Sequence, residues 1–163
     1  MKTLIVYATK HGTTENAVNI LKSKLTGDVN LVNIMLEPAT QLEEYDIIIL
    51  GGSIYMGKIQ KKLSTFILIN LPLLLKKQIG LFICAGEKDK ALVSKELIFA
   101  FPATLFDHAI VKEVFGFELD MNKLNFFEKF VINKLKGVKT SIHELSETKI
   151  DAFAKNINKV SHL

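Results

Sequence analysis

Several residue types are scarce in this sequence or missing from it, and each shortage excludes a class of protein. The 163 residues include no tryptophan, no arginine and a single cysteine. One cysteine cannot form an internal disulfide, which argues against a disulfide-stabilised secreted scaffold and fits a reducing compartment. The longest apolar run, residues 66–75, contains a proline and an asparagine, and it is far shorter than the roughly 20 residues that span a bilayer. We therefore expect a cytosolic protein.

Composition and charge narrow the choice further. Apolar residues make up 48% of the chain, enough for a substantial core, and we find no linker and no internal repeat. We expect residues 1–163 to form one domain. The net charge of +4 suits an anionic ligand or a membrane surface. The lysines are not interleaved with aromatic residues, so we expect no nucleic-acid partner, and the histidines lack the spacing of metal ligands.

Strand-like apolar runs alternate with segments of helical periodicity along the chain. The strand-like runs are residues 2–8, 29–34, 46–50, 79–85 and 108–117; the helical segments are residues 14–25, 59–69, 90–101, 123–134 and 147–160. Such alternation predicts an α/β fold with a parallel sheet covered by helices on both faces. Five strands favour the doubly wound order 2-1-3-4-5, which places a ligand site at the carboxyl ends of the first and third strands.

Three turns at that edge of the predicted sheet have unusual residues. They contain Thr9, Lys10, His11, Gly12, Thr13 and Thr14 after the first strand, Gly52, Ser53, Ile54, Tyr55, Met56 and Gly57 after the third, and Ala85, Gly86 and Glu87 after the fourth. The first turn joins a strand to a helix, and its hydroxyls, its glycine and the helix N-terminus suit a phosphate group. It has neither the dinucleotide fingerprint nor the nucleoside-triphosphate loop, and the first strand ends without the acidic cluster of a receiver domain. A threonine-capped helix without a ligand is the simpler alternative.

The first turn also resembles a known family. Residues 7–15, YATKHGTTE, look like the flavodoxin phosphate loop, in which a T/S-x-x-G-x-T pattern follows the first strand. Residues 51–57 are similar to the flavodoxin loop that lies against the flavin ring. The resemblance covers nearly the whole chain and implies a flavodoxin-like fold with bound FMN. It implies that residues 9–14 hold the phosphate, largely through backbone N–H groups, and that residues 52–57 and 85–87 lie near the ring.

Three side chains at this edge have two interpretations each. Tyr55 is the only aromatic residue in the three turns, so it is the candidate for stacking on the flavin; the alternative is packing against the next helix. His11 is expected to contribute its backbone N–H, with an acid–base role as the alternative. Cys84 closes a buried strand and is expected to be a small core residue rather than a redox thiol.

The charges of the three turns predict a flavin that is easier to reduce than in acidic flavodoxins. Lys10, Lys58 and Lys88 outnumber Glu15 and Glu87 in this part of the sequence. Positive neighbours stabilise the extra electron of a reduced flavin by Coulomb attraction. Such a potential suits the removal of electrons from a substrate.

Residues 121–136 are the departure from a plain short flavodoxin. Leu124, Phe127 and Val131 form an apolar line at helical spacing beside several lysines, which predicts an inserted helix. The helix either faces the core or lies at an interface with anionic lipid or an apolar partner. With this insertion, the chain resembles the flavodoxin-like, quinone-dependent protoporphyrinogen dehydrogenases. In that family, FMN takes electrons from a tetrapyrrole precursor and passes them to a membrane quinone.

Three functions follow as hypotheses. The resemblance implies an FMN oxidoreductase that transfers electrons from a porphyrinogen-type substrate to a quinone, with peripheral membrane contact through residues 121–136. A soluble flavodoxin-type electron carrier with a protein redox partner is the second, and a flavin-free interaction module is the third. The basic charge and the insertion favour the first over the second, and the intact Thr/Gly loop disfavours the third. No residue is assigned a catalytic role.

Overall fold

Five parallel strands form the central sheet. The computed structural model describes residues 1–9, 12–55, 57–123, 126, 129–130, 133–134, 137 and 139–160. The strands are β1 (Lys2–Ala8), β2 (Asp28–Asn33), β3 (Ile47–Ser53), β4 (Gln78–Cys84) and β5 (Val111–Val114). They pair in the order β2-β1-β3-β4-β5, and each neighbouring pair is parallel. This confirms the doubly wound order that the sequence predicts.

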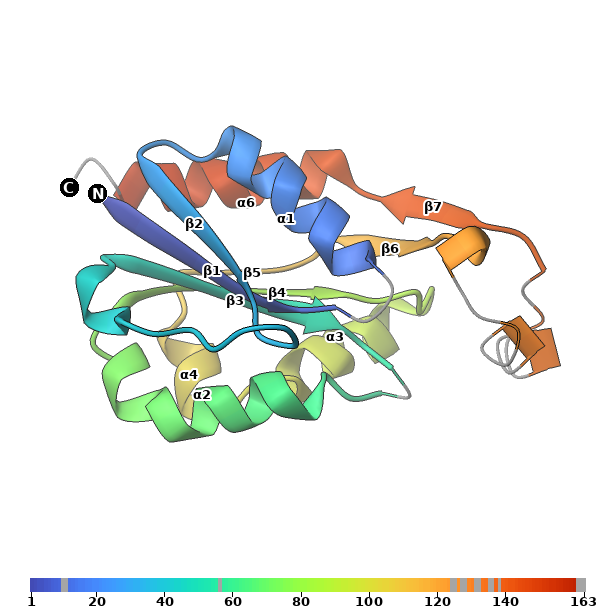
Figure 1. Cartoon of the computed structure of the whole chain (residues 1–163), viewed down its shortest axis with the longest axis horizontal. Helices are drawn as coiled ribbons and strands as arrows, with labels where there is room; N and C mark the ends of the chain where they lie inside the picture. Colours follow the sequence, from blue (N-terminus) through green and yellow to red (C-terminus); the bar gives the residue numbers. More distant parts are fainter. Residues whose placement is uncertain are drawn as a thin grey trace.

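Helices cover both faces of this sheet, as Figure 1 shows. One face carries α1 (Thr13–Lys24) and α6 (Glu147–Val160), and the other carries α2 (Lys61–Leu74), α3 (Lys90–Phe99) and α4 (Ala103–His108). Because the central strands are buried on both sides, their sequences are continuously apolar and do not alternate with polar residues. In β3, for example, residues 47–50 are Ile-Ile-Ile-Leu, and none of them is exposed.

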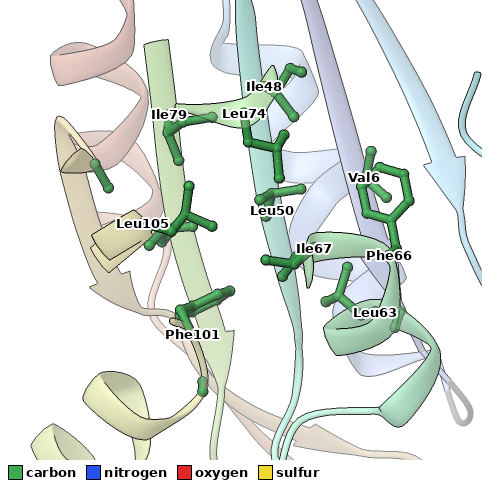
Figure 2. Close-up of a cluster of buried hydrophobic side chains, with 14 of the residues drawn as sticks. Val6, Ile48, Leu50, Leu63, Phe66, Ile67, Leu74, Ile79, Phe101 and Leu105 are labelled. Atoms are coloured by element: carbon green, nitrogen blue, oxygen red, sulfur yellow. The ribbon is translucent and has the colours of Figure 1, made fainter. Parts of the chain in front are cut away.

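The larger hydrophobic cluster lies between the sheet and α2, α3 and α4. Figure 2 shows its centre, where Leu50 of β3 lies near Ile67 of α2 and Ile48 lies near Leu74, with Leu105 of α4 beside β4. Fully burying such a side chain contributes about 1.5–3 kcal/mol to folding. This packing fixes where α2 and α3 begin, and hence where the turns that precede them lie.

The connection between β2 and β3 contains the 3₁₀ turn η1 (Leu42–Glu44). The loop that follows β2 and the first half of α2 border a shallow apolar groove. Its lining includes Ile34, Leu36, Phe66 and Ile69, of which Leu36 and Ile69 are largely exposed. None of the described residues that line the groove belongs to the three turns that the sequence singles out.

The prediction of one strand over residues 108–117 is wrong at both ends. Residue 108 ends α4, a short helix that follows Pro102, and β5 begins at Val111. The strand is also interrupted, because Gly116 adopts a φ of +90° that turns the chain out of the ladder. The next strand, β6 (Gly116–Leu119), pairs antiparallel with β7 (Ile142–Leu145), which lies in a stretch that the sequence indicates only as polar.

The predicted inserted helix lies between β6 and β7. The 3₁₀ turn η2 (Met121–Lys123) opens the segment, and the described residues Phe126, Lys129, Phe130, Asn133 and Lys134 are helical. The apolar line of the prediction, Leu124, Phe127 and Val131, lies outside the described residues. Among the helices that the described residues form, none has the length and hydrophobicity needed to cross a bilayer.

The close approach at Gly51 yields a prediction about stability. A Cβ atom at this position would overlap the buried ring of Phe82. That ring stacks on Phe115 at a centroid distance of 4.6 Å, so it cannot easily move. We expect Gly51→Ala to lower the free energy of unfolding by about 1–3 kcal/mol, measured by urea denaturation. Combined with Phe82→Leu, it should cost less than the sum of the two single changes; strictly additive effects would contradict the proposed overlap.

Candidate functional site

Three turns meet at the carboxyl edge of the sheet: residues 9–12 before α1, residues 54–60 before α2 and residues 85–89 before α3. Two hydrogen bonds connect these turns and the elements that flank them. The hydroxyls of Thr14 and Ser53 are 2.8 Å apart, which connects the start of α1 to the end of β3. The backbone N–H of Ile54 donates to the carbonyl of Cys84 at 2.8 Å, which connects the second turn to the end of β4. The structure thus brings the three predicted segments together.

The first turn leads from β1 into α1. Gly12 is the N-cap of α1 and has a φ of +88°, a conformation that favours glycine. Its N–H donates to the hydroxyl of Thr9 at 3.0 Å, and its carbonyl accepts from the N–H of Asn16 at 3.1 Å. The N-terminal end of α1, where the helix dipole is positive, therefore lies at the carboxyl edge of the sheet. Lys10 and His11 of the predicted site lie outside the described residues.

The three threonine hydroxyls of this turn have different roles. All three residues are buried. Thr13 donates its hydroxyl hydrogen to the backbone carbonyl of Glu118, so this hydrogen is not available to a phosphate in this arrangement. Thr14 is engaged with Ser53. Thr9 accepts a hydrogen bond, and among the described residues no acceptor takes its own hydroxyl hydrogen, which makes it the best placed of the three for an anion.

The second turn is a tight hairpin-like reversal. The backbones of Tyr55 and Lys58 exchange two hydrogen bonds, of 2.9 and 3.1 Å, and Gly57 at the tip has a φ of +72°. The side chain of Tyr55 is 56% exposed, so its ring is accessible and is not part of the core. This geometry is compatible with the proposed stacking role. Met56, another predicted site residue, lies outside the described residues.

Gly52 has a packing role at the end of β3. A Cβ atom there would come within 2.6 Å of the amide oxygen of Gln60 and 3.1 Å of Ile59. The missing side chain therefore leaves room for the residues that lead into α2. Ser53 and Ile54 follow directly, so this close packing sets the position of the second turn.

The third turn is held by its own carboxylates. Glu87 accepts from the backbone N–H groups of Lys88 and Asp89 at 2.7 and 2.9 Å. Asp89 caps α3 by accepting from the N–H groups of residues 91 and 92. The carboxylate of Glu87 thus has a structural role in this arrangement.

Sequence reasoning missed the residues that β6 brings to this edge. The carbonyl of Gly116 accepts from the N–H of Ala85 at 2.9 Å, and the ring of Phe117 would lie 3.1 Å from a Cβ atom on Gly86. Glu118 contacts the first turn of α1. These residues are distant along the chain from the turns that they contact, so no local pattern identifies them.

Cys84 lies beneath the site as a buried free thiol. Burial raises its pKa to about 12, although a hydrogen bond with Thr14 acts in the opposite direction. The thiolate required for redox chemistry or metal binding is therefore disfavoured. In the described part of the chain, no three His, Cys, Asp or Glu side chains are grouped as metal ligands would be.

Comparison with known proteins places this geometry in a family. Residues 4–146 match the flavodoxin domain family. The chain belongs to this family. Comparison with curated protein sequences gives no match. The match over residues 4–146 includes the first turn, the second turn and both strands β6 and β7.

Solved structures agree on the fold. The flavodoxin of Streptococcus pneumoniae TIGR4 has a TM-score of 0.57 and 17% identity, with 100% of both chains covered. A WrbA-like flavodoxin protein from Agrobacterium tumefaciens has a TM-score of 0.61 and 14% identity, with 99% of this chain and 98% of that chain covered. The Fusobacterium nucleatum flavodoxin bound to flavin mononucleotide has a TM-score of 0.54 and 16% identity, with 98% of each chain covered. The fold is thus flavodoxin-like.

The buried thiol gives a prediction that labelling measures. With a pKa of about 12, about one thiol in ten thousand is ionised at pH 8, so we expect native Cys84 to react with a thiol reagent only as the protein unfolds. In urea it should react at once. A Cys84→Ser protein that also has Ser94→Cys, on the exposed side of α3, is the control and should react rapidly when folded. Rapid labelling of native Cys84 would show that the thiol is accessible.

Proposed function

We propose that this protein binds FMN at the carboxyl edge of its sheet and acts as a redox protein. The observation that carries the proposal is the convergence of three turns at the topological switch point, the first of which has a T-x-x-G-x-T pattern and a left-handed glycine at a helix N-terminus. When bound, FMN supplies the reversible gain and loss of electrons. The protein supplies binding, orientation and the electrostatic surroundings.

The residues of the turns suit the parts of FMN. A phosphate group requires hydrogen-bond donors, and the first turn offers the hydroxyl of Thr9, the N-terminal amides of α1 and the positive end of its dipole. The exposed ring of Tyr55 suits one face of the flavin. Lys10, His11 and Met56 are included on the strength of the resemblance. The name of the Fusobacterium relative, which is bound to flavin mononucleotide, supports the same assignment.

The phosphate assignment is testable with a pair of threonines at opposite ends of one strand. Thr9 directly follows the carboxyl end of β1, and Thr3, also buried, lies near the amino end of the strand. We expect Thr9→Val to weaken FMN binding about tenfold or more, as the loss of a hydrogen bond to a charged group implies. Thr3→Val, the matched control, should leave binding unchanged.

Riboflavin, which lacks the phosphate, shows whether the effect is specific. Thr9→Val should leave the affinity for riboflavin nearly unchanged, measured by quenching of flavin fluorescence. An equal loss of affinity for both flavins would contradict the assignment of the phosphate to the first turn. A protein that purifies without flavin and binds neither flavin would favour the flavin-free interaction module.

The proposed electron donor and acceptor depend on the surface formed by residues within 121–136. Phe126 is 89% exposed and Phe130 is 57% exposed, and the ammonium group of Lys134 lies 5.8 Å from the centroid of the Phe130 ring. Exposed aromatic rings beside lysines suit the interface with anionic lipid. They support the proposal that the protein passes electrons from a porphyrinogen-type substrate to a quinone. A soluble carrier with a protein redox partner is the alternative, and it requires no such surface.

A redesigned hairpin separates these alternatives. Leu119 and Ile142 face each other across the β6–β7 ladder, so an Asn-Gly turn in place of residues 120–141 should join the two strands. We expect the parent to sediment with anionic vesicles at low salt and to oxidise a porphyrinogen in the presence of a quinone. The shortened protein should bind FMN but lose both properties. Neutral vesicles are the control, and a parent that shows no turnover with quinones but exchanges electrons with a soluble reductase would be a carrier.

A further inference from the structure

Glu118 connects β6 to the first turn of α1. Its backbone carbonyl accepts the hydroxyl of Thr13, and its carboxylate accepts from the side-chain amide of Asn16 at 2.7 Å. The second carboxylate oxygen lies 2.8 Å from Nδ1 of His143, its partner across the ladder on β7. Only 18% of the Glu118 side chain is exposed, whereas His143 is largely solvated. One residue of β6 thus contacts two residues of α1, at its first and fourth positions.

The same two strands are attached at the third turn and at their base. Gly116 pairs with Ala85, and Glu144 lies 3.5 Å from the ammonium group of Lys88. At the base, the N–H of Ser146 donates to the carbonyl of Phe115 at 2.8 Å. We call β6 and β7, residues 116–119 and 142–145, the arm. The arm therefore contacts the first and the third of the three turns. It is also hydrogen-bonded at one end, next to the sheet.

We propose that the arm is part of the phosphate site and that Glu118 is a positioning residue for it. The inference rests on the proposed binding of FMN. The amides that would hold the phosphate belong to the first turn of α1, and Glu118 fixes that turn from outside through Thr13 and Asn16. The side chain of Glu118 has two acceptor oxygens, so one can hold Asn16 while the other contacts His143. Glu118 does not touch the phosphate; it acts through α1.

The coupling between phosphate binding and the position of the arm must act in both directions. If a seated arm favours the turn that binds phosphate, bound phosphate must favour the seated arm by the same factor. Riboflavin has the same ring and ribityl chain but no phosphate, so it should produce little of this effect. The comparison of FMN with riboflavin therefore separates positioning of the phosphate turn from general support of the fold.

Three variants test the role of Glu118. We expect Glu118→Ala to weaken FMN binding about tenfold, a factor equivalent to about 1.4 kcal/mol, and to change riboflavin binding little. Glu118→Gln keeps an acceptor for Asn16 and should restore FMN binding to within about twofold of the parent. Glu144→Gln is the control, because it removes a charge from the same arm at a residue whose carboxylate lies beside Lys88 and not beside α1. It should leave the ratio of FMN to riboflavin affinity unchanged.

The outcomes separate this inference from the proposed function. A parent that binds FMN, with a Glu118→Ala protein that binds it equally well or loses both flavins equally, would overturn the positioning role alone. Tighter FMN binding by Glu118→Gln would also overturn it, because charge repulsion would then dominate. In the parent, FMN should slow amide hydrogen exchange in residues 116–119 and 142–145 about tenfold more than riboflavin does at equal saturation. Equal protection by the two flavins would contradict the coupling, and a parent that binds neither flavin would overturn both proposals.

Discussion

The end of the central strand lacks side chains on both faces, and the candidate site depends on this feature. Gly51 leaves room on one face for the ring of Phe82, which stacks on Phe115 and meets Phe153 edge-on. Gly52 leaves room on the other face for the residues that lead into α2. Since adjacent residues of a strand face opposite sides of the sheet, the two glycines allow close packing from above and below at the same level.

This packing determines how the three turns meet. β3 lies between β1 and β4, so the position of its last residues fixes both neighbouring turns. Ser53, the next residue, reaches Thr14 on α1, and Ile54 bonds to the backbone of Cys84 at the end of β4. Side chains at residues 51 and 52 would push Phe82 and the start of α2 away from the sheet. The position of the site therefore depends on the packing around these two glycines.

Much of the fold was predictable because its strongest signals are local. The continuous apolar runs of β1, β3 and β4 record burial on both faces, and each is bounded by turn residues. The arm was not predictable in this way. β6 and β7 have four residues each and are separated by a long insertion, so their pairing is a contact between distant segments. Residues 142–145, Ile-His-Glu-Leu, do not alternate between apolar and polar residues, and four residues are too few to distinguish a strand from a polar loop.

The same distinction applies to the site. The glycine and the threonines of the first turn can be identified from the sequence because a left-handed residue and a helix start leave a local pattern. The hydroxyl of Thr13 does not, since its acceptor, the carbonyl of Glu118, is 105 positions further along the chain. The balance of charges around the candidate site also depends on contacts between distant segments. Counted along the turns, lysines dominate, but the arm places Glu144 beside Lys88 and the carboxylate of Glu118 beside α1. An exposed pair such as Lys88–Glu144 contributes only about 0–1 kcal/mol, yet its negative partner offsets the field of the lysine at a nearby ligand. The net charge of +4 is therefore a poor guide to the electrostatic field at the candidate site, which depends on charges that the folded chain brings together from distant segments.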